Sequence, residues 1–321
     1  MNLLAKKTAN HASFQAFINC YLREIDGGVL HTNSEWEQKT GLSFSADNTY
    51  ILELQLSHLN TSLAMGVTYY SLVGRHVVTS VFQKKDNQWH WQAMDYLSTI
   101  FLLVNNIYHV DDSNQSTPLN QDKIELLART LESHQVMQDY LVTRFEDPKL
   151  QSPSYIDSEQ SILFGHWLHP TPKSRQGIHD WQHKHYTPEL AGKFQLHFFV
   201  VNRQFVRQNS ILPETTEDII QLIIDQAPNI PVLEQLNDNQ QLVPVHPLQA
   251  QWLLHQDYIQ TLIEQGELKD VGSMGATFTP TSSVRTLYCD ALDFMIKLSI
   301  PVKITNSLRI NMEHELDAGL Y

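Results

Sequence analysis

Cationic and hydroxyl side chains gather in one stretch of the chain, between Thr281 and Arg309. They include Thr281, Ser282, Ser283, Arg285, Thr286, Lys297, Thr305, Ser307 and Arg309. An arginine offers a planar fork to a phosphate or carboxylate, a lysine offers a point charge, and hydroxyls with strand-end N–H groups complete such a site. Each hydrogen bond to a charged partner contributes about 1.5–3 kcal/mol net, so several together could hold a polyphosphate. The stretch predicts an anion site, although the same spacing also fits a solvated sheet face with scattered basic residues.

Three strand-like runs must position these side chains: Val284–Cys289, Phe294–Ser299 and Val302–Ile310. Asp290-Ala-Leu-Asp293 and the Ile300-Pro301 pair separate the runs, which predicts an antiparallel meander. Successive side chains on a strand point to opposite faces. The second run therefore places Lys297 opposite its apolar residues Phe294, Ile296 and Leu298. The third run places Thr305, Ser307 and Arg309 opposite Ile304, Leu308 and Ile310.

The composition is typical of a soluble globular protein of one large domain or two ordinary ones. The chain has 321 residues, of which 42% are hydrophobic and 18% charged, and a net charge of −13. So acidic a chain lacks the basic surface that non-specific nucleic-acid binding requires. Cys20 and Cys289 lie far apart in no metal-binding spacing, which suits a reducing compartment. No signal peptide or apolar run of the ~18 residues that span a bilayer is found, so we expect a cytoplasmic protein without a membrane segment.

The first 150 residues predict a mixture of helices and antiparallel strands. An amphipathic helix is expected over Phe14–Ile25, an apolar helix over Met94–Tyr108, and a third helix from an Asn120 cap to about Phe145. Four strands of a meander are expected between the first and second helices: Tyr50–Ser57, Thr61–Leu72, His76–Gln83 and Trp89–Gln92.

A linker at Gln151–Ser154 predicts a domain boundary near 150, which divides the chain into residues 1–150 and 151–321. In the second part we expect a short helix at Ser158–Phe164, a helix at Glu214–Gln226 and another from His246-Pro247 to about Gln265. Strands are expected at Phe194–Val206 and Leu242–Val245. The fold class is therefore α+β, with an antiparallel sheet and flanking helices in the second part.

Six of the sixteen histidines lie between His166 and His197. His179 and His183, four residues apart, could share a helix face and bind zinc. The zincin pattern also needs a glutamate after the first histidine, where this chain has Asp180, and no clear third ligand follows. A polar, partly solvated segment is the favoured interpretation, and no residue is assigned to a metal.

The loop Gly165–Gly177, GHWLHPTPKSRQG, is rich in glycine, proline and basic residues. It resembles the GHPxHPxxKxRxG signature of the siderophore synthetases that work without a nonribosomal peptide template, the aerobactin-synthetase-like family. His169-Pro170, Lys173, Arg175 and Gly177 match the signature, whereas its first His-Pro pair is His166-Trp167 here.

Three further segments follow in the order of that family. The segment 243–249, VPVHPLQ, is similar to the family's VPVHPWQ, with Leu248 in place of tryptophan. The segment 282–286, SSVRT, is similar to its S-x-R-T nucleotide motif. Lys297 and the segment 304–309, ITNSLR, stand where the family has a lysine and a T-N-x-x-R strand. The resemblance covers residues from about 155 to 310.

The resemblance implies a hand-like fold in which residues 1–150 form a thumb and residues 151–321 the sheet of the fingers. A third, C-terminal palm would complete the nucleotide and metal site. Because this chain ends at Tyr321, soon after the fingers strands, we expect it to be the N-terminal portion of a longer synthetase and inactive by itself. Glu313, Glu315 and Asp317 are candidate magnesium ligands, but a solvated acidic segment is the favoured interpretation.

The resemblance also implies a reaction and a role for each matching residue. Family members join a citrate-type carboxylate to an amine, such as a polyamine, or to an alcohol through an acyl-adenylate, with ATP and Mg²⁺, and dimers are common. ATP phosphates would contact Ser282, Ser283, Arg285, Thr286 and Lys297. The carboxylate substrate would contact Thr305, Asn306 and Arg309. Three residues are expected to act in catalysis: Arg309, His169 and Lys173.

A second hypothesis is a module that binds an anion or a partner chain without catalysis. A phosphotransferase of another fold is disfavoured because no Gly-rich loop ending in Lys-Ser/Thr is found. The sequence leaves open which carboxylate, amine or alcohol is used.

Overall fold

The computed structural model describes residues 3–109, 121–152, 154–210, 213–227, 236–304 and 307–309. Residues 307–309 are described by their backbone alone. The chain divides into two compact units. The first holds Met1–Phe145 and Leu163–Arg175, and the second holds Glu146–Ile162 and Gln176–Tyr321. The segment Leu163–Arg175 thus groups with the first unit, so the chain passes between the units more than once, whereas we predicted a single boundary near residue 150.

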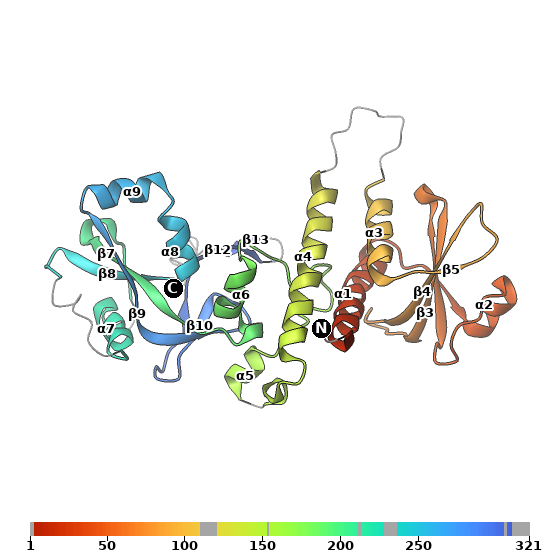
Figure 1. Cartoon of the computed structure of the whole chain (residues 1–321), viewed down its shortest axis with the longest axis horizontal. Helices are drawn as coiled ribbons and strands as arrows, with labels where there is room; N and C mark the ends of the chain where they lie inside the picture. Colours follow the sequence, from red (N-terminus) through yellow and green to blue (C-terminus); the bar gives the residue numbers. More distant parts are fainter. Residues whose placement is uncertain are drawn as a thin grey trace. The chain divides into compact units, whose positions relative to one another are not determined.

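The first unit is an antiparallel sheet with helices on both faces (Figure 1). Its five strands lie in chain order: β1 Val29–Thr32, β2 Tyr50–Leu56, β3 Thr61–Tyr69, β4 Val77–Lys85 and β5 Gln92–Ala93. Helices α1 Leu3–Glu24 and α3 Tyr96–Ile107 cover one face, and α2 Asn33–Thr40 lies against the other. Helix α4 Gln121–Arg144 packs along α1.

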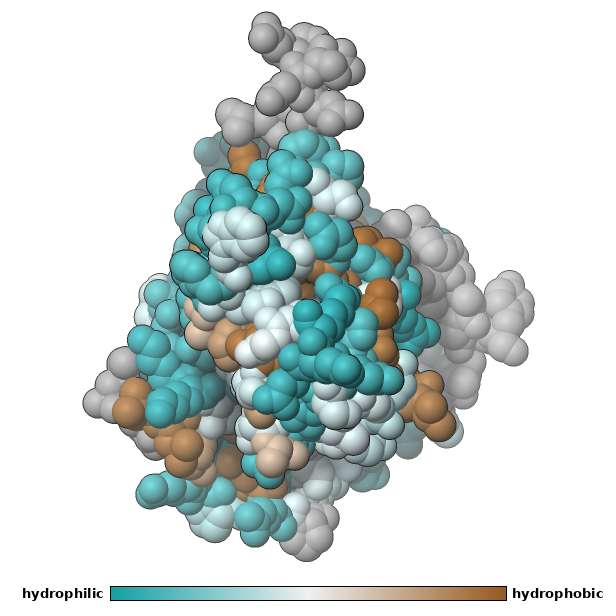
Figure 2. Space-filling model, turned by 90° about the vertical axis from the view of Figure 1, so that its right-hand side faces the viewer, coloured by the Kyte–Doolittle hydropathy of each residue, from teal (hydrophilic) through white to brown (hydrophobic). Residues whose placement is uncertain are grey.

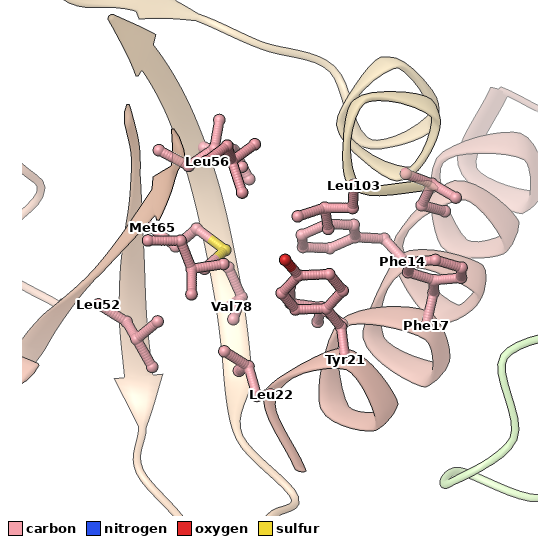
Figure 3. Close-up of a cluster of buried hydrophobic side chains, with 14 of the residues drawn as sticks. Phe14, Phe17, Tyr21, Leu22, Leu52, Leu56, Met65, Val78 and Leu103 are labelled. Atoms are coloured by element: carbon pink, nitrogen blue, oxygen red, sulfur yellow. The ribbon is translucent and has the colours of Figure 1, made fainter. Parts of the chain in front are cut away.

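The core of this unit joins the apolar stripe of α1 to one face of the sheet (Figure 3). Phe14, Phe17 and Tyr21 recur at helical spacing and are almost fully buried. They face sheet residues such as Leu52 of β2 and Met65 of β3, which are paired across the two strands and so project to the same face. The apolar stripe of the helix and the alternating apolar residues of the strands therefore meet in one core.

The opposite face of the sheet carries a smaller cluster around Trp36 of α2. Thr32 and Glu35 form a reciprocal capping box at the start of α2, and Gly41 in the left-handed conformation ends it. Trp36 is fully buried and lies edge-on against Trp91, with ring centroids 5.4 Å apart. Figure 2 shows this side of the unit, where hydrophobic residues form small separate patches among hydrophilic ones. Neither β1 nor α2 was predicted, because β1 has only four residues and α2 has Trp36 as its one apolar residue.

The second unit is built on a five-stranded antiparallel sheet of order β11-β10-β9-β7-β8. The strands are β7 Phe194–Asn202, β8 Gln240–Val245, β9 Leu268–Pro280, β10 Thr286–Tyr288 and β11 Ile296–Lys297. Helix α7 Thr216–Ile224 packs on one face of this sheet. Helices α8 Pro247–Leu253 and α9 Asp257–Glu264 pack on the other. The mixture of helices and antiparallel sheets in both units confirms the predicted α+β class.

Three short strands make a separate sheet of order β13-β12-β6. They are β6 Arg175–Gln176, where the chain enters the second unit, β12 Ile300–Ile304 and β13 Ser307–Arg309. Two short helices complete the unit, α5 Tyr155–Glu159 and α6 Asp180–Tyr186. None of the described helices combines the length and the apolar content needed to cross a membrane.

The predicted three-run meander is wrong in its last part. The first and second runs do pair, as β10 with β11, but β12 belongs to the other sheet. Alternate residues Ile300, Val302 and Ile304 are buried in a cluster of their own with Leu248 and Val284, which draws the third run away from β11. That run is also not one strand, because Ile304 pairs with Ser307 across a chain reversal.

Two further predictions needed correction. The helix expected from His246 to Gln265 is interrupted between Leu253 and Asp257, so α8 and α9 each turn a separate apolar face to the sheet. The strand β9 was not predicted, because Lys269, Asp270 and two glycines interrupt the spacing of its apolar residues. The predicted Asn120 cap lies outside the described residues.

Candidate functional site

The turn between β9 and β10, residues 281–286, is closed by its own hydrogen bonds. The N–H and the hydroxyl of Thr281 both donate to the carbonyl of Thr286, each at 2.9 Å. The N–H of Thr286 donates to Oγ of Ser283 at 3.0 Å, and the N–H of Val284 donates to the carbonyl of Thr281 at 2.8 Å. The turn is therefore set by the chain before any ligand arrives, which is the condition for an electrostatic site that needs no reorganisation.

Val284 holds the turn in an uncommon backbone conformation. Its φ is +70°, in the left-handed region that a β-branched residue rarely adopts. Such a conformation costs on the order of 1–3 kcal/mol and persists only where the surroundings enforce it. The Val284 side chain is fully buried beside Ile300 and Val302, which supplies that enforcement. As a result its neighbours Ser283 and Arg285 keep partly or fully exposed positions on the turn.

Lys297 lies directly across from this turn. Thr286 of β10 is paired with Lys297 of β11, and the N–H of Leu298 donates to the carbonyl of Arg285 at 3.0 Å. Paired residues on antiparallel strands project to the same face with Cβ atoms roughly 4.5–5.5 Å apart. The structure thus gathers Ser283, Arg285, Thr286 and Lys297, predicted as phosphate contacts, at one edge of the second unit's sheet.

The loop with the family signature owes its shape to its two glycines. Gly165 has φ +72°, and a Cβ there would lie 2.9 Å from Cβ of Pro172. Gly177 has φ +106°, and a Cβ there would lie 2.6 Å from the carbonyl oxygen of Pro301. Both positions combine a left-handed backbone with a close approach, so each requires glycine.

The segment Leu163–Arg175 of this loop is bound to helix α4 within the first unit. The N–H of Lys173 donates to Oγ of Ser133 at 2.9 Å. The two oxygens of Glu132 accept from the hydroxyl of Ser174 at 2.7 Å and from the N–H of Arg175 at 3.0 Å. Sequence reasoning missed Glu132 and Ser133, because only the fold brings a residue of α4 to a loop some forty positions later.

His169 and Lys173 both sit in this anchored segment. Nδ1 of His169 accepts from the N–H of Thr171 at 3.1 Å, so the neutral ring carries its proton on Nε2 and can donate there. Partial burial, helped by the charge of Arg129 and by His166, lowers the pKa of His169 and favours that neutral form. Lys173 is only 2% exposed. The catalytic roles of both residues stay predictions.

Trp167 marks the point where this chain departs from the family signature. The guanidinium carbon of Arg75 lies 5.4 Å from the centroid of a Trp167 ring, within the range of a cation–π interaction. The replacement of proline by tryptophan therefore adds a contact between the loop and the β3–β4 connection of the same unit.

His246, in the VPVHP segment, is a buried histidine that caps helix α8. Its Nδ1 accepts from the N–H of Leu248 at 3.1 Å, and its ring centroid lies 4.7 Å from that of Phe194. The side chain is fully buried, and Nε2 has no hydrogen-bond partner among the described residues. Burial lowers the pKa of His246 from 6.5 to about 3, because a charged ring would lose its hydration there.

The buried His246 predicts a loss of stability in acid. The unfolded chain binds a proton near pH 6.5 and the folded one only near pH 3, so the free energy of unfolding falls as the pH drops through that window. His246→Asn keeps an acceptor for the N–H of Leu248 but cannot titrate. We expect the variant to be less stable than the wild type at pH 7, and the difference in Tm to narrow at pH 4. A difference that stays constant between the two pH values would contradict the neutral, buried state of His246.

The predicted site residues fall into two sets. His169 and Lys173 belong to the first unit, whereas the residues from Ser282 to Lys297 and the backbone of Arg309 in β13 belong to the second. That the two sets face one ligand stays a prediction. Thr305, Asn306, Glu313, Glu315 and Asp317 lie outside the described residues. In the part of the chain that is described, no three His, Cys, Asp or Glu side chains gather closely enough to hold a metal ion.

Comparisons with known proteins agree with the motifs. The model of the IucA / IucC family matches residues 154–321. The spermidine-citrate ligase of Bacillus anthracis is 38% identical over 98% of this chain, and the L-2,3-diaminopropanoate–citrate ligase of Staphylococcus aureus is 31% identical over 97% of it. The solved structure of ATP-bound aerobactin synthetase IucA from a hypervirulent pathotype of Klebsiella pneumoniae superposes with a TM-score of 0.80, at 27% identity over 96% of this chain.

The chain spans about half the length of these relatives: 53% and 50% of the two ligases and 52% of the aerobactin synthetase chain. The matched residues 154–321 include the turn at 281–286, Lys297 and the VPVHP segment, which resemble motifs of the same family. On the family match, the relatives and the fold together, the chain belongs to the IucA / IucC family.

Proposed function

We propose that this chain forms part of a ligase that joins a citrate-type carboxylate to an amine or alcohol, at the expense of ATP, in siderophore biosynthesis. The observation that carries the proposal is the edge formed by the 281–286 turn and Lys297, where a preset backbone holds Ser283, Arg285 and Thr286 next to the strand of Lys297. Its support from outside the chain is the likeness to an ATP-bound synthetase over nearly the whole sequence.

The proposed chemistry has two displacements. A carboxylate oxygen of the substrate attacks the α-phosphorus of ATP, the bond from that phosphorus to the bridging oxygen breaks, and pyrophosphate leaves. The amine nitrogen, or a hydroxyl oxygen, then attacks the acyl carbon, the bond to the adenylate oxygen breaks, and AMP leaves as the nucleophile gives up a proton. The first displacement brings two anions together, so positive side chains and fixed dipoles must neutralise charge and hold the reacting groups in line.

In this proposal Ser283, Arg285, Thr286 and Lys297 bind the phosphates of ATP. The hydroxyl of Ser283 accepts from the N–H of Thr286 and lies 3.3 Å from the hydroxyl of Thr281, which a phosphate oxygen would replace as the acceptor of its proton. Arg309, together with Thr305 and Asn306, binds the carboxylate substrate. His169 donates from Nε2 to a phosphate or adenylate oxygen, and Lys173 contributes positive charge.

Substrate and cofactor details extend the proposal further. Citrate is named for both ligase relatives, and their amines are spermidine and L-2,3-diaminopropanoate. With spermidine–citrate ligase at 38% identity, a polyamine is the first amine to try. Mg²⁺ would accompany ATP, and we assign it no ligand because the described residues offer no group of three donor side chains. We also propose that the protein acts in the cytoplasm as a homodimer.

The direct test is citrate-dependent release of pyrophosphate by the full-length protein, with ATP and either a polyamine, diaminopropanoate or an amino alcohol. We expect release with citrate and ATP that rises when the correct amine is present. Failure of every combination, with a folded protein, would contradict the proposed ligase.

Lys297→Ala is expected to weaken ATP binding about tenfold or more, because one charge-assisted hydrogen bond to a phosphate is lost. Calorimetry with a non-hydrolysable ATP analogue measures the effect. Lys269→Ala, which removes an exposed lysine from β9 of the same sheet, is the matched control. Equal affinities for wild type and Lys297→Ala would exclude Lys297 from the phosphate site.

A non-catalytic module that binds an anion or a partner chain is the alternative. It predicts that the full-length protein binds ATP or citrate but releases no pyrophosphate. The same assay therefore separates the two functions.

A further inference from the structure

A carboxylate outside the family motifs contacts the 281–286 turn. One oxygen of Glu159, the last residue of α5, accepts from the N–H of Ser282 at 3.0 Å and from its hydroxyl at 2.6 Å. Both residues belong to the second unit. These two donors are the ones that Ser282 could otherwise offer to a phosphate, so Glu159 and a nucleotide would compete for Ser282.

Helix α5 is held in place by hydrogen bonds of its own, which keep Glu159 in position to accept from Ser282. Ser154 caps the helix by accepting from the N–H of Asp157 at 3.2 Å. The next residue after Glu159, Gln160, is 6% exposed and donates from Nε2 to the carbonyl of Pro280 at 3.5 Å. Glu159 and Gln160 thus hold the chain on both sides of Thr281, where β9 ends and the turn begins.

The other end of α5 is fixed to the neighbouring strand. The ring of Tyr155 lies edge-on to that of Tyr288, with centroids 5.7 Å apart, and its hydroxyl lies 3.5 Å from Sδ of Met295. Tyr288 belongs to β10, so α5 spans from the strand after the turn to the turn itself. A helix held at both ends can keep its terminal carboxylate in one place.

The turn needs such support because it contains a strained residue. Val284, with φ +70°, follows Ser282 by two positions, and relaxation of its backbone would move Ser283 and Arg285. Burial of the Val284 side chain restrains one side of the turn, and the bonds from Ser282 to Glu159 restrain the other.

We propose that Glu159 is a positioning residue, which binds Ser282 permanently so that Ser283, Arg285 and Thr286 keep the conformation that receives the ATP phosphates. This role rests on the proposed function. In consequence Ser282 is the anchor of the turn rather than a phosphate contact, in contrast to the role that the S-x-R-T resemblance implies. The opposite possibility is that Glu159 occupies the place of a phosphate and leaves when ATP binds.

The two possibilities predict opposite signs when the carboxylate is removed. If Glu159 positions the turn, Glu159→Ala raises the KM for ATP about tenfold while kcat changes little, and the Kd for an ATP analogue rises in parallel. Glu159→Gln keeps an oxygen that accepts from Ser282 and is expected to restore most of the affinity. If Glu159 were a competitor of phosphate, both variants would bind ATP more tightly than the wild type.

Hydrogen exchange gives a readout that does not depend on activity. The amide of Ser282 is expected to exchange roughly tenfold faster or more in Glu159→Ala than in wild type and Glu159→Gln, because its acceptor is gone. Glu264→Ala, which removes an exposed glutamate at the end of α9, controls for loss of negative charge from the same unit.

The outcomes separate the two proposals. Wild-type protein that binds no ATP would overturn the proposed function and this role with it. ATP binding by the wild type with equal or tighter binding by Glu159→Ala would overturn only the role of Glu159. Unchanged exchange at Ser282 would also overturn it, whereas weaker binding, faster exchange and rescue by glutamine together would establish it.

Discussion

Replacement of Arg309 by alanine in the full-length protein is expected to lower citrate-dependent turnover by roughly 10²–10³-fold, as for other lost electrostatic stabilisers. Arg309 lies on β13, where it is paired with Ile300 of β12, so its backbone is part of a defined sheet. In the proposed reaction it neutralises negative charge where the carboxylate meets the α-phosphate. Pyrophosphate release at saturating ATP and citrate measures the effect.

Two further variants sharpen this test. Arg309→Lys keeps the charge but loses the planar fork, and we expect an activity between those of wild type and Arg309→Ala. Arg203→Ala, which removes an exposed arginine paired with Glu217 in the same unit, should leave turnover nearly unchanged. Near-normal turnover by Arg309→Ala would refute its place at the reacting centre.

Gly177→Ala is expected to destabilise the protein strongly, by several kcal/mol. The left-handed backbone costs a residue with a side chain about 1–2 kcal/mol. At φ +106° the added Cβ would also lie 2.6 Å from the carbonyl oxygen of Pro301, which is backbone and cannot rotate away. The chain must therefore shift between β6 and β12, and the fall in Tm measures the cost.

Gly272→Ala is the matched control, because Gly272 lies in the same unit with φ +81° but has nothing within 4 Å of its virtual Cβ. It isolates the cost of the backbone conformation from the cost of the close contact. We expect Gly177→Ala to lower Tm clearly more than Gly272→Ala does. Equal losses would show that the contact with Pro301 relaxes without cost.

Local patterns predicted several of the long elements, although they missed β9 and the part of α1 before Phe14. Residues within a single element are enough to predict the apolar stripe of α1, the alternation along β2 to β4 and the boundaries of α4. The short strand β1 and the polar helix α2 gave no such signal. They exist because Trp36 can bury its ring against the sheet, which depends on residues far along the chain.

The third strand-like run, Val302–Ile310, illustrates the same limit. Alternation of Ile304, Leu308 and Ile310 fits one continuous strand, yet the chain reverses after Ile304 and pairs with itself. Ile300 and Val302 prefer a cluster with Leu248 and Val284 over the edge of β11. Two distant apolar surfaces compete for such a strand. The periodicity within the strand does not reveal which of them it will cover.

The candidate site was predictable in its motifs but not in its support. Ser283, Arg285, Thr286 and Lys297 could be named because their residue types match a chemistry and a family pattern. Glu159 and Glu132 could not be predicted, because the residues around them in the sequence do not indicate that their carboxylates accept hydrogen bonds from a distant turn or loop. Glu159 is 123 positions from Ser282, so only the folded chain reveals it.

The passage of the chain between its units affects how the protein can be divided for experiments. Leu163–Arg175 belongs with residues 1–145, although Glu146–Ile162 precede it in the second unit. A fragment expressed from residue 151 onward would contain Leu163–Arg175 but lack Ser133 and Glu132. The backbone N–H groups of Lys173 and Arg175 would then lose their acceptors. A fragment that ends at residue 150 would expose to solvent the surface of α4 that Leu163–Arg175 contacts. Neither half is self-sufficient, so the two units are best produced together from one uncut polypeptide.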